Sequence, residues 1–236
     1  MNITKQIKED LAIFTNINNV QTYKRFFKTK AGDYAHKDVF LGIKVPDIRK
    51  IVKKYFLDLC FSHINEFLHS PYHEYRMFAL LVLTYQYKSK KLNKKEEIFN
   101  FYIQNISWVN NWDLIDVTSP HIVGDYLIKE DKSILYEFAR SNNLWKKRVA
   151  IISTFAFINN ENYQDTLKIA DILLKDEHDL IHKAVGWAIR NIGKKDENTM
   201  IEFLNQRYKK MPRTMLRYAI EKLPEQLRQN YLKGTI

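Results

Sequence analysis

A repeat of about 35 residues is the feature that most restricts the fold of this chain. Five apolar runs share it, each with an anchor residue near its start: Arg76, Trp112, Arg148, Lys183 and Arg217. Successive anchors lie 36, 36, 35 and 34 residues apart, and four of the five are basic. A period of this length is too short for most β-α-β units and fits two antiparallel helices joined by tight turns. The repeat predicts an all-α solenoid of stacked antiparallel helical hairpins.

The composition agrees with a chain built of helices. Only 6 glycines and 5 prolines occur in 236 residues, and 45% of the residues are hydrophobic, as in ordinary globular proteins. The run 149–158 is rich in β-branched residues and could form a strand, but its length and its register in the repeat favour a buried helix. We therefore expect one domain of helical repeats over residues 1–236.

Local signals place two helix boundaries. Ser70, Pro71 and Glu74 predict an N-cap, a proline at the first helical position and an acid in the first turn. Pro120 has no N–H to bond the carbonyl of Asp116, four residues earlier, so the helix should kink or begin anew there. Such a break would be a reason for the Asp116 side chain to project outward.

Cysteine usage and hydropathy exclude several classes of protein. The single cysteine, Cys60, rules out an internal disulfide and a cysteine-cluster metal site. Because it lies in the apolar run 56–61, we expect a buried and inert thiol. The N-terminal residues lack the apolar core of a signal peptide, and no stretch approaches the roughly 18 apolar residues of a membrane span. We expect a cytoplasmic protein without a membrane partner.

The net charge of +11 is unevenly distributed along the chain. Residues 1–100 carry 18 Lys+Arg and 10 Asp+Glu, residues 101–180 carry 8 and 12, and residues 181–236 carry 12 and 5. Two basic flanks suit a polyanion such as DNA, held along a concave basic groove of the solenoid. Two alternatives stay open: a lysine-rich composition with solvated loops, and basic side chains that only reach the rim of each inner helix.

Five short motifs then follow one another along nearly the whole chain. They are FLGIKVPDIR (40–49), NWDLID (111–116) with GDY (124–126), WKKR (145–148), DLIHKAVGWAIR (179–190) and MPRTMLRY (211–218). Together they resemble the alkylpurine DNA glycosylase family called AlkD, the DNA alkylation repair enzymes with HEAT-like repeats. The resemblance implies a concave face that binds duplex DNA containing N3- or N7-alkylated purines. It also implies hydrolysis of the N-glycosidic bond without base flipping, by a monomer that needs no cofactor or metal.

The resemblance also assigns roles to individual residues. The essential carboxylate falls on Asp116, its flanking aromatic groups on Trp112 and Trp187, and its arginine on Arg148. Members carry an aromatic side chain near the N-terminus that faces the lesion, and Tyr23 and Phe27 are both possible matches. Further candidate DNA contacts, taken from the repeat and the motifs, are Arg76, Lys183, Arg190, Arg213 and Arg217.

The chemistry explains why these residue types suit the reaction. An N3- or N7-alkylated purine is cationic and leaves as a neutral base, so it needs little acid assistance. A fixed carboxylate stabilises the oxocarbenium-like sugar and can orient the attacking water, which is the role expected of Asp116. The electron-rich faces of Trp112 and Trp187 favour contact with a cationic nucleotide. Asp113 is the alternative carboxylate, but its position on another helix face favours a cap or an ion-pair partner.

Three other functions compete with this hypothesis. The pairs His69/His73 and His178/His182 have the i,i+4 spacing of metal ligands, but neither has an obvious third ligand, which favours solvated or capping roles. A helical-repeat protein that binds damaged or distorted DNA without catalysis would share the basic surface. A protein-binding solenoid of the HEAT type would share the repeat but needs neither the net charge nor the tryptophans.

Overall fold

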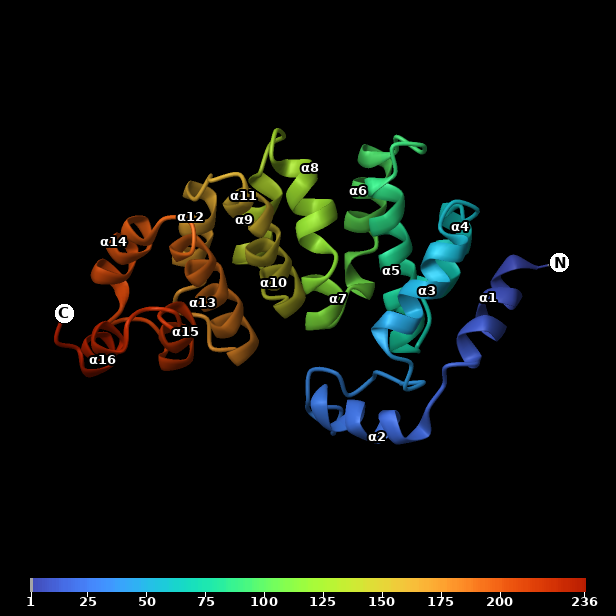
Figure 1. Ribbon diagram of the computed structural model, residues 1–236, viewed down its shortest axis with the longest axis horizontal. Helices are drawn as coiled ribbons and strands as arrows, with labels where there is room; N and C mark the ends of the chain where they lie inside the picture. Colours follow the sequence, from blue (N-terminus) through green and yellow to red (C-terminus); the bar gives the residue numbers. More distant parts are fainter. Residues whose placement is uncertain (1) are drawn as a thin grey trace. The chain divides into compact units, whose positions relative to one another are not determined.

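The computed structural model describes residues 2–236, which form helices and no β-strand (Figure 1). The chain divides into two compact units, Met1–Thr118 and Ser119–Ile236. The predicted all-α class with helical repeats is confirmed, whereas one domain over residues 1–236 stays a prediction. Among the described residues, no helix is both long enough and apolar enough to cross a membrane.

The first unit is organised around α5. Its elements are α1 (Ile3–Ala12), α2 (Ile17–Phe26), α3 (Val45–Tyr55), α4 (Phe61–Leu68), α5 (His73–Lys88), α6 (Lys95–Gln104), the 3-10 turn η1 (Ile106–Trp108) and α7 (Trp112–Asp116). Helix α5 contacts α3, α4, α6 and α7 (Figure 1). Its central run 77–83 is buried on every side, as expected of a helix that is apolar all round.

The loop 38–43 closes over the N-terminus of α5. The Glu74 carboxylate is buried and accepts hydrogen bonds from the backbone N–H groups of Leu41, Gly42 and Ile43 at 2.9, 2.8 and 3.3 Å. The backbone N–H of His73 donates to Val39 O at 2.8 Å. The predictions of an N-cap at Ser70 and of Pro71 at the first helical position are wrong, since α5 begins at His73, whereas Glu74 lies in the first turn as predicted. The loop 38–43, rather than Ser70, therefore provides hydrogen-bond partners for the His73 N–H and the Glu74 carboxylate in the first turn of α5.

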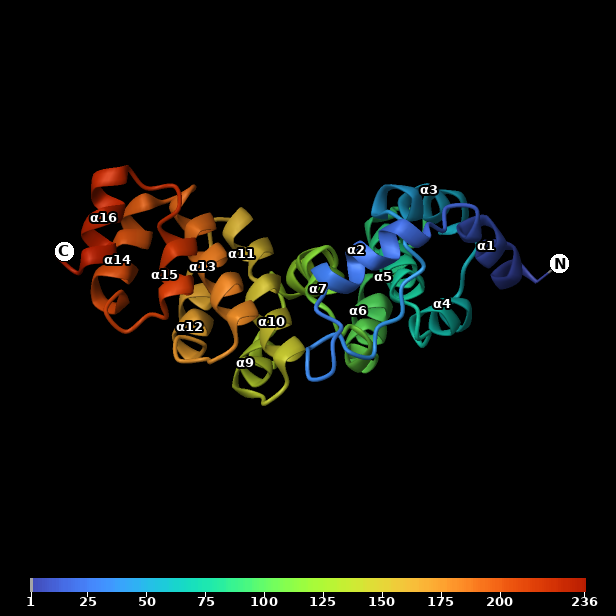
Figure 2. The same ribbon diagram turned by 90° about the horizontal axis from the view of Figure 1, so that it is seen from below.

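The second unit is organised around α13. Its elements are the π-helical turn η2 (Pro120–Gly124), α8 (Asp125–Leu127), α9 (Ser133–Arg140), α10 (Leu144–Ser153), α11 (Phe155–Asn159), α12 (Gln164–Ile172), α13 (Asp179–Gly193), α14 (Glu197–Arg207), α15 (Arg213–Ala219) and α16 (Glu225–Lys233). Figure 2 shows α13 beside α15. A Cβ atom at Gly186 would lie 2.4 Å from Met215 O, so glycine permits this close approach.

The predicted register of the repeat is confirmed. Each of the five anchors lies in the first two turns of a helix, in the order α5, α7, α10, α13 and α15. The run 149–158 is helical, and belongs to α10 and α11. Helix α7 ends at Asp116, and regular α-helical structure gives way to η2 at Pro120, in agreement with the predicted break.

The loop over α5 generates a test with a matched control. Gly42 has φ +77°, and a Cβ atom there would lie 2.1 Å from Asn16 O; Gly32 has φ +88° but open space around it. Both Gly→Ala variants carry left-handed backbone strain of about 1–2 kcal/mol, and Gly42→Ala adds overpacking of about 1–3 kcal/mol. Urea unfolding followed by circular dichroism should show the larger loss of unfolding free energy for Gly42→Ala. Equal losses would mean that the loop does not press on Asn16.

Candidate active site and nucleic-acid interface

Helix α7 carries the WDLID sequence and is fixed at its start by Asn111. The Asn111 side chain is fully buried; its Oδ1 accepts from the Trp112 N–H at 2.8 Å, and its Nδ2 donates to Asp38 Oδ2 at 2.8 Å. Leu114 and Ile115 are fully buried, whereas Trp112 and Asp116 are half-buried. The i,i+4 spacing therefore places an indole and a carboxylate together on the less buried side of one short helix.

Five rings form what we call the aromatic cluster: Tyr23, Phe26, Phe27, Phe40 and Trp112. Phe27 stacks on Trp112 with ring centroids 5.5 Å apart and on Phe40 at 5.2 Å, while Tyr23 meets Phe27 edge-on at 6.2 Å. Phe26 meets Trp112 edge-on at 5.5 Å. The cluster connects α2 directly to the helix that carries Asp116.

The members of the aromatic cluster differ sharply in exposure. Phe27 is 7% exposed and Tyr23 is half-buried, but Phe26 is 61% exposed beside the indole of Trp112. Phe27, one of the two rings predicted to face the lesion, is therefore an interior ring, whereas Tyr23 is half-buried and Phe26, which was not among the candidates, is exposed. The signal was available, since Val20, Tyr23 and Phe27 share the i, i+3, i+7 spacing of one buried helix face and Phe26 lies off it.

A second group, the buried charge cluster, lies under the start of α7. It consists of Asp38, His73, Arg76, Asn111 and Asp113. His73 contacts Asp113 Oδ2 through Nε2 at 2.8 Å and Asp38 Oδ2 through Nδ1 at 3.3 Å. Arg76 Nη2 donates to Asp38 Oδ1 at 2.6 Å. The cluster joins the loop 38–43, α5 and α7.

Contacts within the buried charge cluster shift the pKa values of His73 and Asp38. Burial alone would lower the pKa of His73, but the charge and hydrogen bond of Asp113, together with those of Asp38, raise this pKa to about 9. Burial opposes ionisation of Asp38, yet the hydrogen bond from His73 and the charge of Arg76 hold the pKa of Asp38 below its usual value. An imidazolium between two carboxylates is therefore the form present near pH 7.

Two aspartates of α7 thus have different surroundings. Asp113 is the ion-pair partner of His73, which agrees with the cap or ion-pair role expected for it. Asp116 ends the helix, half-buried above Tyr102. Burial and the charge of Asp116 raise the pKa of Tyr102, whose hydroxyl meets Thr118 Oγ1 at 3.1 Å. Asp116 is therefore near enough to Tyr102 for its charge to act on a buried hydroxyl of the first unit.

Arg76 does not fit the predicted phosphate contact. It is 2% exposed, and its guanidinium donates to Asp38 and to the carbonyls of Ser70 and Pro71 at 3.0 and 3.1 Å. The carboxylate that holds it inside lies 38 residues earlier in the chain. Arg76 is therefore corrected from a candidate DNA contact to an interior cation.

In the second unit, the structure places the predicted arginine and tryptophan on neighbouring helices. Arg148 on α10 is 4% exposed, and its Nη1 donates to Leu180 O in the first turn of α13 at 2.6 Å. Trp187 on α13 is half-buried and meets Phe155 edge-on at 4.7 Å. Arg148 thus ties α10 to the start of α13 and is not a freely extended surface cation. The meeting of Asp116, Trp112, Trp187 and Arg148 at one lesion stays a prediction.

The remaining basic candidates are divided between paired and exposed side chains. Lys183 pairs with Asp179 at 2.6 Å, and Arg190 pairs with Glu221. Arg213 and Arg217 are exposed on α15, four residues apart, and Arg213 also donates to Leu232 O at 2.9 Å. Among these four candidates, the two arginines of α15 are therefore the exposed ones.

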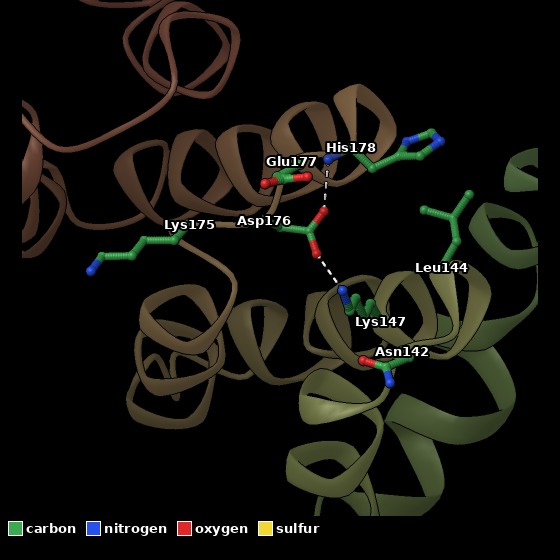
Figure 3. A pocket seen from close by; sticks show the side chains of 7 residues that line it. All are labelled: Asn142, Leu144, Lys147, Lys175, Asp176, Glu177 and His178. Carbon is green, nitrogen blue, oxygen red and sulfur yellow. Dashed lines mark hydrogen bonds and ion pairs between the residues drawn. The ribbon is translucent and has the colours of Figure 1, made fainter.

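A surface cavity of about 540 Å³ lies between the starts of α10 and α13 (Figure 3). It is lined by Asn142, Leu144, Lys147, Lys175, Asp176, Glu177 and His178. Lys147 Nζ meets Asp176 Oδ2 at 2.6 Å, as Figure 3 shows, and Asp176 Oδ1 accepts from the His178 N–H at 2.9 Å. Because acids match the lysines, this cavity lacks the positive charge expected of a phosphate site.

The structure shows the contacts of the histidine pairs and of Cys60. Residues 2–236 contain no group of three or more His, Cys, Asp or Glu side chains arranged to hold a metal. His73 belongs to the buried charge cluster, and His178 caps α13 by accepting from the Leu180 N–H. Cys60 is exposed, which corrects the expected buried thiol. It is the N-cap residue of α4, and its hydrogen bonds with Ser62 and His63 lower the pKa of the thiol.

Comparison with known proteins places the chain in a family. Residues 7–223 match the model of the family described as DNA alkylation repair enzyme. The chain belongs to that family. Comparison with curated proteins gave no match.

Solved structures support the same fold. A predicted DNA alkylation repair enzyme from Enterococcus faecalis superposes with a TM-score of 0.70 at 18% identity, covering 89% of this chain and 97% of the other. AlkD2 from Streptococcus mutans superposes with a TM-score of 0.55 at 19% identity, covering 94% and 98%. At these identities the likeness shows a shared helical-repeat fold. As a member of a DNA alkylation repair family, the protein is expected to act on DNA.

The corrected role of Arg76 can be tested by comparing two arginines. Arg76→Met breaks a buried ion pair by removing its cation and leaves Asp38 with only His73 and Asn111 as partners, which should lower the free energy of unfolding by about 3–5 kcal/mol. Arg217→Met, at an exposed position, should change it by less than about 0.5 kcal/mol. Urea unfolding followed by circular dichroism measures both. Similar small changes would contradict the structural role given to Arg76.

Proposed function

We propose that this member of the DNA alkylation repair family is a glycosylase that hydrolyses the N-glycosidic bond of N3- or N7-alkylated purines in duplex DNA. The observation that carries the proposal is the pairing of Trp112 and Asp116 on one side of α7, with the exposed Phe26 beside the indole. Rings and a carboxylate on one surface match both parts of the substrate, a flat cationic base and a sugar that becomes positive.

The roles follow from the chemistry of the leaving group. The alkylated base already carries the positive charge that acid catalysis would otherwise supply, so the sugar is what needs stabilisation. Asp116 offers its carboxylate to the oxocarbenium-like sugar and to the attacking water. Trp112 and Phe26 offer ring faces and edges to the cationic nucleotide. The chemistry is proposed to proceed without base flipping, as the resemblance to the AlkD family implies.

DNA affinity is proposed to come largely from other residues. Lys24, Arg25 and Lys28 are exposed around Phe26 in the first unit, and Arg213 and Arg217 are exposed on α15 in the second. Contacts from such cations to phosphates release counterions and make binding depend on salt. Trp187 and Arg148 are proposed to support the same reaction, with Arg148 acting from its buried position at the start of α13.

A second candidate function is binding of damaged DNA without excision. It shares the cations and the aromatic surface but gives no role to a carboxylate beside Trp112, because an anion near DNA opposes phosphate binding. The position of Asp116 on the less buried side of α7, beside Trp112, favours excision over simple binding.

The proposal is tested by neutralising that carboxylate. Asp116→Asn preserves the size of the side chain but removes the charge that stabilises the sugar, so single-turnover release of 7-methylguanine from methylated duplex DNA should fall by about 100-fold or more. Duplex affinity should hold or increase. Asp58→Asn, which neutralises an exposed carboxylate of the same unit, is the control. Equal rates for Asp116→Asn and wild type would refute the assignment, and absent release by wild type would favour the binding function.

The aromatic surface gives a separate prediction about α2. Phe26→Ala removes an exposed ring beside Trp112 and should weaken binding to alkylated duplex by about 1–3 kcal/mol, the range for base–aromatic stacking, with little loss of stability. Phe27→Ala removes an interior ring and should instead cost about 3–5 kcal/mol of unfolding free energy. Fluorescence anisotropy and thermal melting of both variants separate the two effects. A stable Phe27→Ala that loses DNA affinity would restore Phe27 as the lesion-facing ring.

A further inference from the structure

An ion-pair bridge centred on His73 lies beneath α7, and the proposed chemistry gives it no role. Its ring is 3% exposed, lies in the first turn of α5, and contacts Asp113 on one side and Asp38 on the other. Asp113 lies in the first turn of α7, three residues before Asp116. The imidazole therefore joins the helix that carries the proposed catalytic carboxylate to the core of the first unit.

We propose that His73 is a positioning residue for base excision, because its bridge between Asp38 and Asp113 sets where α7 presents Trp112 and Asp116. The inference rests on the proposed glycosylase function for its kinetic consequence. The geometric part, the placement of Trp112 by His73, does not depend on that function.

The contacts of His73 reach the indole by two routes. The first passes through hydrogen bonds: Asp38 accepts from Asn111 Nδ2 at 2.8 Å, and Asn111 Oδ1 accepts from the Trp112 N–H at 2.8 Å. The second passes through rings: the His73 imidazole lies 5.0 Å from the ring of Phe27, and Phe27 stacks on Trp112. A change at His73 is therefore transmitted to both the backbone and the ring of Trp112.

Helix α7 depends on such external support. It has only five residues, Trp112–Asp116, and a helix this short does not persist through its own hydrogen bonds. Its buried residues Leu114 and Ile115 fix its depth in the core. The bridge to His73 fixes the orientation of its first turn, because a short contact between charged groups is directional and strong when buried.

The surroundings of His73 predict how the bridge responds to pH. Asp38 from the loop and Asp113 from α7 contact His73, Arg76 from α5 pairs with Asp38, and Glu74, the next residue of α5, faces the amides of the loop. Tyr23, in the adjoining aromatic cluster, has a pKa raised by burial and stays neutral over the same range. Since the pKa of His73 is raised to about 9, the bridge contributes fully below the ordinary histidine pKa and is lost as pH rises through about 9.

The first experiment follows Trp112 itself and needs no DNA. The indole N–H resonance of Trp112, assigned by its loss in Trp112→Phe, should shift or broaden in His73→Gln. It should stay in place in His69→Gln, whose imidazole stacks on Trp108 at the end of α4. In wild type, ¹⁵N-labelled histidine should show the His73 ring titrating near pH 9, with the Trp112 signal changing over the same range. An unchanged Trp112 signal in a folded His73→Gln would overturn the proposal.

The second experiment measures single-turnover release of 7-methylguanine. His73→Gln should slow release by about 10- to 100-fold, the range for misplacement of reacting groups, while duplex affinity changes less than about 3-fold. Because His73 acts through Asp113, the double variant His73→Gln/Asp113→Asn should be no slower than the slower single variant. If the double variant instead slowed release by the product of the two single effects, His73 and Asp113 would act independently, and the proposed route from His73 through Asp113 would be overturned.

The two experiments separate the possible failures. If wild type releases no base but the Trp112 signal responds to His73→Gln, the glycosylase function fails and the positioning of Trp112 by His73 stands. If wild type releases base and His73→Gln does so at the same rate with an unchanged Trp112 signal, the positioning proposal fails alone. If His73→Gln folds poorly, two measurements still test the positioning of Trp112 by His73. They are the pH titration of wild type and the double variant His73→Gln/Asp113→Asn, in which both partners of the ion pair are neutral.

Discussion

The structure of the first unit depends on a buried imidazolium held between the buried carboxylate of Asp38 and the half-buried carboxylate of Asp113. Removing such charges from water costs several kcal/mol for each ion, which is tolerated only where nearly every charged atom has a partner. Here Asp38 accepts from His73, Arg76 and Asn111, and Asp113 accepts from His73. Three segments far apart in the sequence, the loop 38–43 and the starts of α5 and α7, must therefore come together in one arrangement. The local geometry around Trp112 and Asp116 follows from that constraint.

This constraint also separates the two aspartates of WDLID. An aspartate neutralised by a buried cation is a poor choice for stabilising a positive sugar, since its charge is already balanced. Asp113 is in that position. Asp116, at the less buried end of the same helix, has its charge felt by Tyr102 and belongs to the side of α7 that carries Trp112. The motif thus places one carboxylate in the bridge to His73 and the other on the side of α7 that carries Trp112.

Much of the fold could be predicted from the sequence, because helical repeats show themselves in local periodicity. The register of the five anchors and the helical state of 149–158 follow from spacing, and the break at Pro120 follows from the missing N–H of proline. The exposure of single side chains could not be predicted so well. Arg76 is buried because Asp38, 38 residues earlier, meets it, and no periodicity reports a partner at that distance. Phe26 and Phe27 differ in exposure because only one of two adjacent rings can lie on the buried side of the chain at the end of α2. Cys60 is exposed, and it caps the start of α4 instead of lying inside an apolar helix.

The burial of Arg76 and Arg148 changes how affinity and chemistry are distributed in the proposed function. Had all the basic anchors lined one surface, phosphate binding and catalysis would have depended on the same residues. Instead, exposed cations on α2 and α15 are separate from the interior cations that hold Asp38 and the start of α13. The exposed set responds to salt because its charges are screened by water and ions. The interior set does not, because it is enclosed by protein. In the proposed function, substitution of the exposed cations would therefore change affinity for undamaged DNA without disturbing Asp116 and the rings proposed to act on a lesion.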